Sequence, residues 1–186
     1  FLSCNAHKNL TDPRDNQNYP IVKIKGLWWT AQNMNYAVDG CQYYNYEQSN
    51  EKKSGKMYTW EMAQQVCPPG WRLPTDKELI DLFLPYGKVS YSGESEEYKK
   101  TFGPYAPEKT EPTYTKLIQD NKMNFPVFDM SGVEDQRTML WSSLCSGKER
   151  AFAIYWRSID QYIEYNSVHF SDYPREFYGF CRCVKK

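Results

Sequence analysis

Cysteines are the residues of this chain whose type and spacing suit chemistry. There are six: Cys4, Cys41, Cys67, Cys145, Cys181 and Cys183. None forms the Cys-x-x-Cys pair that zinc fingers and thioredoxin-like redox sites use. We therefore predict at least two disulfides, and with them an oxidising compartment.

The last two cysteines suit either a structural or a chemical role. Side chains two residues apart in a strand point to the same side, so Cys181 and Cys183 share a face with Phe177 and Gly179. The two are too constrained to bond comfortably to each other, so each is expected to have its own partner. The alternative is a reactive or metal-binding pair of thiols, but soft thiolate sites usually recruit more ligands. We predict the structural role, with no metal and no cofactor.

Late aromatic residues are the candidate ligand contacts. Alternate side chains of a strand share a face, which groups Phe152, Ile154 and Trp156 and sets Tyr155 and Arg157 opposite them. One of these sets is expected to be more exposed. Tyr, Trp and Arg dominate recognition surfaces, and aromatic faces also stack on sugars. The predicted contacts are Tyr155, Trp156, Arg157, Asp160 and Tyr162, with packing in a small core as the alternative.

Catalytic patterns are weak in this sequence. A Ser-His-Asp set can be drawn from Ser142, His169 and Asp172. No nucleophile elbow or other local signature accompanies it. We therefore predict a chain that is not an enzyme and has no catalytic residue.

The first half of the chain predicts a hairpin followed by a loop. Residues 20–25 have the composition of a strand, Gly26 interrupts the pattern, and residues 27–35 continue as a second strand. Two strands around such a turn form an antiparallel hairpin. Residues 37–56 are polar, aromatic and punctuated by Gly, which indicates a loop that holds Cys41.

Two helices are expected next. Thr59 is a suitable N-cap for a helix over residues 60–66, which Pro68-Pro69-Gly70 must end. The segment Thr75-Asp76-Lys77-Glu78 is a capping box that opens a second helix. The apolar stripe of that helix consists of Leu79, Ile80, Leu82 and Phe83.

The second half predicts a long insertion and then strands. The segment from Lys88 to Arg137 begins with a stretch rich in Gly, Pro, Glu and Lys, which indicates surface loops. Four strand candidates lie at residues 138–144, 150–157, 161–168 and 176–184. Strands, helices, loops and strands in this order predict an α+β domain with an antiparallel sheet.

Composition narrows the possible partners. A chain of 186 residues is long enough for one domain with a substantial core. Its formal net charge is zero, so no strong field favours nucleic acid or an anionic membrane. No apolar run is long enough to span a bilayer. Contact with a membrane is therefore expected only through a lipid.

The first residues indicate such a lipid. Phe1-Leu2-Ser3-Cys4 resembles the end of a bacterial lipoprotein signal, which would place lipid on Cys4. The polar stretch from Asn5 to Asn18 suits a tether. We predict a lipoprotein remnant and tether over residues 1–18 and one domain over residues 19–186. An ordinary cysteine of an extracellular fragment is the alternative.

Four ordered segments resemble the Fibrobacter major paralogous domain family. They are Asp12 to Tyr36 (DPRDNQNYPIVKIKGLWWTAQNMNY), Tyr58 to Leu79 (YTWEMAQQVCPPGWRLPTDKEL), Trp141-Ser142-Ser143 and Tyr178 to Lys185 (YGFCRCVK). The resemblance implies a surface or secreted protein of bacteria related to Bacteroides. It also implies a C-type lectin-like fold, which formylglycine-generating enzymes and variable receptor-binding proteins share. The insertion is longer than the family pattern, and Cys145 and Cys181 depart from it.

The resemblance also implies a disulfide scheme. In C-type lectin-like folds a cysteine of the first helix bonds to one of the last strand, which pairs Cys67 with Cys183. Cys145 then becomes the natural partner of Cys181. Cys41 remains free, or joins Cys67 in a competing scheme.

The sequence thus predicts a disulfide-stapled, non-enzymatic domain that binds a glycan or a protein. Its expected location is the cell surface or outer membrane, held by lipid, or otherwise the secreted fraction. One alternative is an oxidoreductase-type enzyme related to formylglycine-generating enzymes, with Cys181 and Cys183 as reactive thiols. Another is a structural subunit of a surface assembly.

Overall fold

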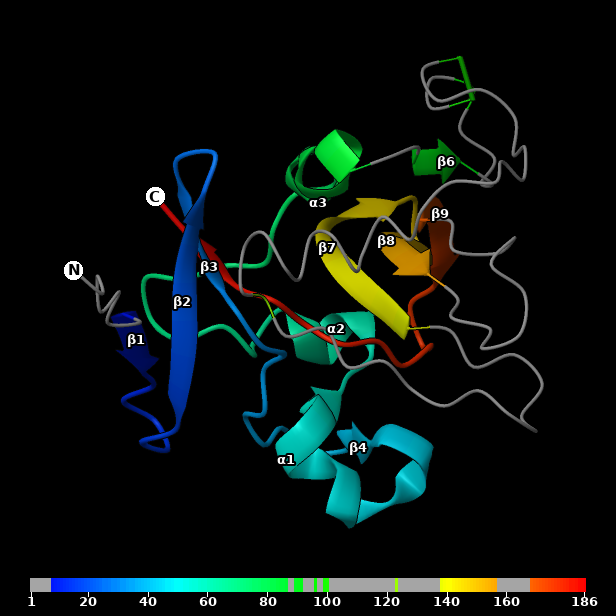
Figure 1. The fold of residues 1–186 in the computed structure, drawn as a ribbon. Helices are drawn as coiled ribbons and strands as arrows, with labels where there is room; N and C mark the ends of the chain where they lie inside the picture. The colour runs from blue at the N-terminus through cyan, green and yellow to red at the C-terminus, as the bar shows by residue number, and fades with distance from the viewer. Residues whose placement is uncertain are drawn as a thin grey trace, which may run out of the picture.

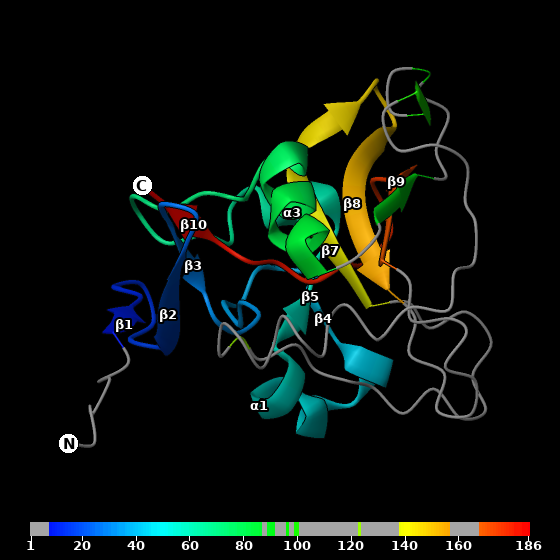
Figure 2. The ribbon, with the colours of Figure 1, turned by 45° about the horizontal axis from the view of Figure 1, so that its top comes forward.

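The computed structural model of the chain describes residues 8–86, 89–91, 96, 99–100, 123, 138–156 and 168–186. These residues form an α+β arrangement of mostly antiparallel strands, which confirms the predicted class (Figures 1 and 2). The strands are β1 (Lys8–Thr11), β2 (Asn18–Ile24), β3 (Leu27–Thr30), β4 (Gln42–Tyr43), β5 (Lys56–Met57), β6 (Val89–Tyr91), β7 (Thr138–Ser146), β8 (Arg150–Trp156), β9 (Val168–Pro174) and β10 (Val184–Lys185). The helices are α1 (Glu51–Ser54), α2 (Trp60–Ala63) and α3 (Asp76–Phe83), with 3₁₀ turns η1 (Tyr44–Tyr46), η2 (Gln48–Asn50) and η3 (Leu84–Tyr86).

The predicted hairpin forms the centre of the first sheet, whose strand order is β1-β2-β3-β10. Ile24 lies opposite Leu27, so the turn between β2 and β3 has two residues. Both of them, Lys25 and Gly26, have positive φ, at 48° and 83°. This is the backbone of a type I′ turn, whose twist matches that of the flanking strands and which glycine adopts without strain.

The predicted tether differs from the structure. Lys8–Thr11 forms β1 and pairs with β2 along its whole length. The side chain of Asp12, which follows it, is fully buried. Polar composition suggested a tether, but main-chain pairing with a neighbouring strand needs no apolar side chains. The folded region therefore includes residues 8–18, and residues 1–7, with Cys4, lie outside the described residues.

Both predicted helix starts are confirmed. The side chain of Thr59 accepts a hydrogen bond from the backbone N–H of Met62 and so caps α2. Thr75 and Glu78 form a reciprocal capping box at the start of α3. The α-helical part of α2 is shorter than predicted, since it ends at Ala63 and continues as turns toward the Pro-Pro-Gly segment.

The second sheet has the strand order β6-β9-β8-β7. Strands β7, β8 and β9 are antiparallel neighbours, whereas β6 pairs with β9 in parallel. Strand β6 lies in the segment predicted as surface loops, yet Val89 and Tyr91 are buried. Strand β9 begins at Val168, where the strand predicted over residues 161–168 ends. The rest of that prediction lies outside the described residues.

Both faces of the second sheet are covered along β8, so the described members of both predicted sets, Phe152, Ile154 and Tyr155, are buried. On one side Phe152 and Ile154 pack in a cluster with the apolar stripe of α3, which lies against β7 and β8 (Figure 2). On the other side Tyr155 packs in a second cluster with Ala63 and Val66 from the α2 segment. A strand buried on both faces cannot present a row of side chains to a ligand.

The C-terminal segment joins the two sheets. It was predicted as one long strand over residues 176–184, but it pairs in short steps with different neighbours. Gly179 bridges to Tyr58, and Phe180 bridges to Leu140 of β7. β10 then pairs with β3. The segment therefore crosses from one sheet to the other as a connector.

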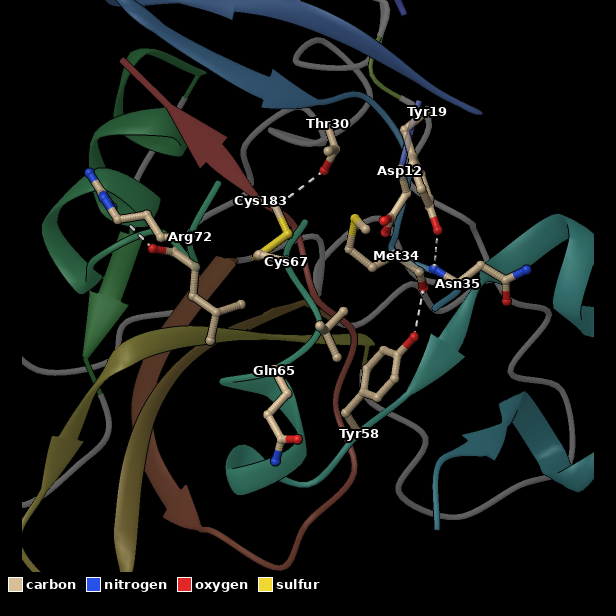
Figure 3. The surroundings of a disulfide bond; sticks show 12 residues. Asp12, Tyr19, Thr30, Met34, Asn35, Tyr58, Gln65, Cys67, Arg72 and Cys183 are labelled. Carbon is tan, nitrogen blue, oxygen red and sulfur yellow. Dashed lines mark hydrogen bonds between the residues drawn. A yellow bond between two sulfur atoms is a disulfide. The ribbon is translucent and has the colours of Figure 1, made fainter. Parts of the chain in front are cut away.

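The implied bridge between Cys67 and Cys183 is present (Figure 3). It joins the segment after α2 to the residue before β10, and 116 positions separate the two cysteines in sequence. Cys183 also exchanges hydrogen bonds of 3.0 Å with Thr30, through its backbone N–H and its carbonyl oxygen. The bridge and these bonds fix the turn after α2 to the first sheet.

The second implied bridge, between Cys145 and Cys181, is absent from the structure. Cys181 is a free thiol that is fully buried in the cluster around Tyr58. Cys145 is a free, exposed thiol near the end of β7. A core position and a surface position do not satisfy the short separation that a disulfide requires. Cys41 is free as well, as one of the two schemes expected.

Candidate functional site

Two adjoining grooves on the surface share the start of α2 as their common wall. Their volumes are about 520 Å³ and 660 Å³. Thr59 and Glu61 line both. The first groove is also lined by Lys148, Glu149, Arg150, Pro174, Arg175 and Glu176, and the second by Arg14, Tyr36, Ala37, Val38, Asp39, Met62 and Gln65. We call them the Arg175 groove and the Arg14 groove.

Backbone hydrogen bonds hold the walls of the Arg175 groove together. The N–H of Trp60 donates to the carbonyl oxygen of Arg175 at 2.9 Å, and the N–H of Arg175 donates to that of Glu149 at 3.0 Å. These two bonds join the start of α2, the β7–β8 turn and the end of β9 through main-chain atoms, which any substitution except proline retains. The indole Nε1 of Trp60 adds a side-chain bond to the carbonyl oxygen of Ser142 at 3.0 Å.

The guanidinium of Arg175 lies over the ring of Trp60, with Cζ 4.4 Å from a ring centroid. Its Nη2 donates to the carbonyl oxygen of Gly147 at 3.1 Å. Its Nη1 approaches Oε1 of Glu61 only to 3.6 Å. Its Nε is buried and has no hydrogen-bond partner among the described residues. Stacking holds this cation in place, while its polar contacts leave donors available.

The other arginine of this groove has a close counter-charge. Nε of Arg150 donates to Oδ2 of Asp172 at 2.8 Å, and Nη2 donates to the Asp172 carbonyl oxygen. The carboxylate of Asp172 is buried, and its Oδ1 has no hydrogen-bond partner in the described part of the chain. Much of the positive charge of Arg150 is therefore balanced within the protein.

Arg14 in the second groove bonds to the end of the α2 segment. Its Nη1 donates to the carbonyl oxygen of Gln65 at 2.8 Å, and its Nη2 donates to that of Val66 at 2.6 Å. Nε and Nη2 also donate to the carboxylate of Asp12. The guanidinium lies over the ring of Tyr36, at 3.7 Å. Carbonyl groups at a helix end lack helical partners, and Arg14 supplies them.

The ion pair with Arg14 changes the acidity of Asp12. Burial acts to raise the pKa of Asp12, but the hydrogen bonds and the positive charge of Arg14 outweigh it, and the pKa is lowered. The hydrogen bond to Asp12 correspondingly raises the pKa of Arg14. Both groups are charged at neutral pH, and the pair stabilises the fold.

Of the five predicted contact residues, only Tyr155 and Trp156 lie among the described residues. Tyr155 is only 9% exposed, and its ring stacks on His169 with centroids 4.8 Å apart. Trp156 ends β8. Arg157, Asp160 and Tyr162 lie outside the described residues. Tyr155, as placed, belongs to the core.

The sequence offered two chemical alternatives, a reactive pair of late cysteines and a Ser-His-Asp set, and the contacts in the structure differ from both. Cys183 is bonded to Cys67, and burial raises the pKa of the Cys181 thiol well above its usual range, so the two are not a reactive pair. The Ser142 hydroxyl bonds to backbone groups of Leu144, and Asp172 pairs with Arg150. These contacts do not link Ser142 to Asp172.

The described residues contain no group of three or more His, Cys, Asp or Glu side chains arranged to hold a metal ion. Their helices are all too short or too polar to cross a bilayer.

The grooves left little trace in the sequence. Their walls come from five separate segments, and Glu61 and Arg175 are more than one hundred positions apart. The N-cap predicted at Thr59 is the part of these walls that the sequence indicated. Comparisons with protein families, with curated proteins and with solved structures found no match to this chain.

Proposed function

We propose that this chain is a binding domain displayed at a bacterial cell surface, and that it binds a protein partner through the two grooves beside α2. The observation that carries the proposal is the pair of adjoining open grooves with Thr59 and Glu61 as a shared wall. Together they offer a surface for an extended peptide segment, such as a loop or a terminus of the partner.

The groove linings favour a protein over a glycan. Six of the eight residues that line the Arg175 groove are charged, three acidic and three basic. Such a mixture of signs gives specificity toward a partner with complementary charges. A sugar stacks on an open aromatic face, but the rings of Trp60 and Tyr36 each have a guanidinium over one face.

The location and the fold family belong to the same proposal. The sequence before Cys4 supports a lipid anchor at that residue, and strand β1 begins four positions later. The disulfide from the segment after α2 to the end of the chain supports a C-type lectin-like fold of the Fibrobacter major paralogous type. Under this proposal the grooves face outward from the cell.

A peptide-display selection on the immobilised domain tests the proposal, with a glycan array in parallel. We expect enrichment of peptides and no reproducible glycan signal. The substitution Glu61→Arg reverses a charge in the shared wall, and Glu61 is exposed enough, at 57% of its side chain, to leave the fold intact. It should abolish the selected binding.

Glu47→Arg is the matched control, because Glu47 is also exposed and lies outside both groove linings. It should bind the selected peptides as the wild type does. Failure to enrich any peptide, or equal binding by the Glu61→Arg and wild-type proteins, would contradict the proposed function.

A further inference from the structure

Two arginines stack on aromatic rings on the two sides of α2, and their hydrogen bonding differs. All three nitrogens of Arg14 donate to acceptors of the protein, namely the Asp12 carboxylate and the carbonyl groups of Gln65 and Val66. These bonds are 2.6–2.9 Å long. Arg14 therefore has little capacity left for a ligand.

Arg175 has that capacity. Among the described residues only its Nη2 makes a hydrogen bond, at 3.1 Å to Gly147, and Oε1 of Glu61 lies 3.6 Å from its Nη1. Its buried Nε–H has no acceptor among the described residues. A buried donor without an acceptor is unfavourable, and it leaves the Arg175 guanidinium without a full set of protein contacts.

We propose that Arg175 binds a carboxylate of the partner, an aspartate or glutamate side chain or a chain terminus, in the Arg175 groove. This inference rests on the proposed function. The ring of Trp60 keeps the guanidinium plane in position. The incoming carboxylate replaces Glu61 at Nη1, which the Glu61 carboxylate approaches only to 3.6 Å. A hydrogen bond between an ionised donor and an ionised acceptor is about twice as strong as a neutral one.

Besides Lys148, and Arg150 with its partner Asp172, the groove has two further carboxylates that bear on what flanks the bound carboxylate. Glu149 and Glu176 line the same groove and have no ion-pair partner in the described part of the chain. A purely acidic segment would be repelled by them. The occupant is therefore a peptide with one acidic residue at Arg175 and basic residues beside it, facing these two carboxylates.

A double-mutant cycle on one selected peptide tests the inference. The peptide is made in two forms, with its acidic residue and with the matching amide, Glu→Gln or Asp→Asn. For the wild-type protein, loss of the carboxylate should weaken binding roughly 10- to 100-fold, the range for a hydrogen bond to a charged group. For Arg175→Gln the two peptides should bind within about twofold of each other.

Two further variants keep the test decisive. Arg72→Gln changes an exposed arginine that pairs with Glu78 outside the groove, and it should keep the wild-type preference for the acidic peptide. Arg175→Lys retains the charge but not the planar fork, and should show an intermediate preference. It also replaces Arg175→Gln if thermal unfolding shows that the latter is not folded.

The outcomes separate the two proposals. Selection of no peptide at all contradicts the proposed function. Selected peptides that bind equally well without their carboxylate, or that keep the preference with Arg175→Gln, overturn only the inference about Arg175.

Discussion

The two ends of the α2 segment differ in how tightly the protein holds them. The far end is fixed by Arg14, which bonds to the carbonyl groups of Gln65 and Val66, and by the Cys67–Cys183 disulfide directly after them. At the start, Thr59 caps the helix and Arg175 stacks on Trp60 with donors to spare. Both ends have a charged residue over an aromatic ring, but only one leaves that charge available.

This difference shows how a short helix can serve both as scaffold and as binding wall. A single helical turn has little stability of its own, so neighbouring groups must hold it. The disulfide and the Asp12–Arg14 pair do so at the far end. The start can then expose polar groups that are not fully satisfied, because the fold does not depend on them. Stability and binding should therefore be lost separately.

Removal of the disulfide is expected to have the largest effect. In Cys67→Ala/Cys183→Ala, loss of a bridge across 116 positions should lower the free energy of unfolding by about 4 kcal/mol, through a freer unfolded chain. Urea unfolding followed by tryptophan fluorescence measures this. Cys145→Ser, at an exposed free thiol, is the control and should change stability by less than about 0.5 kcal/mol. Equal stability of the two variants would show that the bridge is not what fixes this end.

Asp12→Asn should have the next largest effect. It leaves Arg14 without its buried counter-charge, and breaking such a pair from one side costs about 3 kcal/mol. Asp81→Asn is the matched control, since Asp81 pairs with Lys77 on the surface, where an i, i+4 pair contributes about 0.3–0.5 kcal/mol. The comparison would fail if both variants lost the same stability in urea.

The sequence was sufficient for features that depend on a few adjacent residues. Gly26 allowed the hairpin turn, and the hydroxyl groups of Thr59 and Thr75 identified both helix starts. The Cys67–Cys183 bridge came from the resemblance of the surrounding motifs, because six cysteines alone leave many pairings open. These signals are local or shared by a family, and distant contacts do not override them.

Features set by distant contacts were not predictable. The polar residues of β1 gave no strand pattern, since their pairing with β2 depends on main-chain groups. Tyr155 was expected at a surface. The alternation of side chains along β8 shows which residues share a face, but it does not show that a helical segment covers each face. Charged side chains such as Arg14 and Arg175 look alike in sequence. Only their hydrogen bonds in the fold show that one is structural and the other available.

Acid should weaken the fixed end together with two other ion pairs of the domain. The pKa of Asp12 is lowered, and hydrogen bonds from Lys56 and Arg72 lower those of Glu51 and Glu78. A carboxyl group with a lowered folded pKa stabilises the protein above its unfolded pKa, and this contribution is lost as protons bind at lower pH. Stability should therefore be constant from pH 7 to about 5 and fall progressively toward pH 2. In Asp12→Asn the fall, measured as urea midpoints, should be smaller; an unchanged slope would contradict the role of this pair.

Thr59→Ala is expected to have the smallest effect on stability and to report on the open end alone. It removes the side-chain acceptor of the Met62 N–H, a loss that costs about 1 kcal/mol at a typical N-cap. Hydrogen exchange should show faster opening at the start of α2, while the amides near Cys67 keep wild-type protection because the disulfide and Arg14 hold them. Thr75→Ala is the control at the start of α3, and it should lose a similar stability without changing exchange in α2. If exchange at both ends of α2 rose equally in Thr59→Ala, the segment would open as a single unit, and its start could not vary independently of its fixed end.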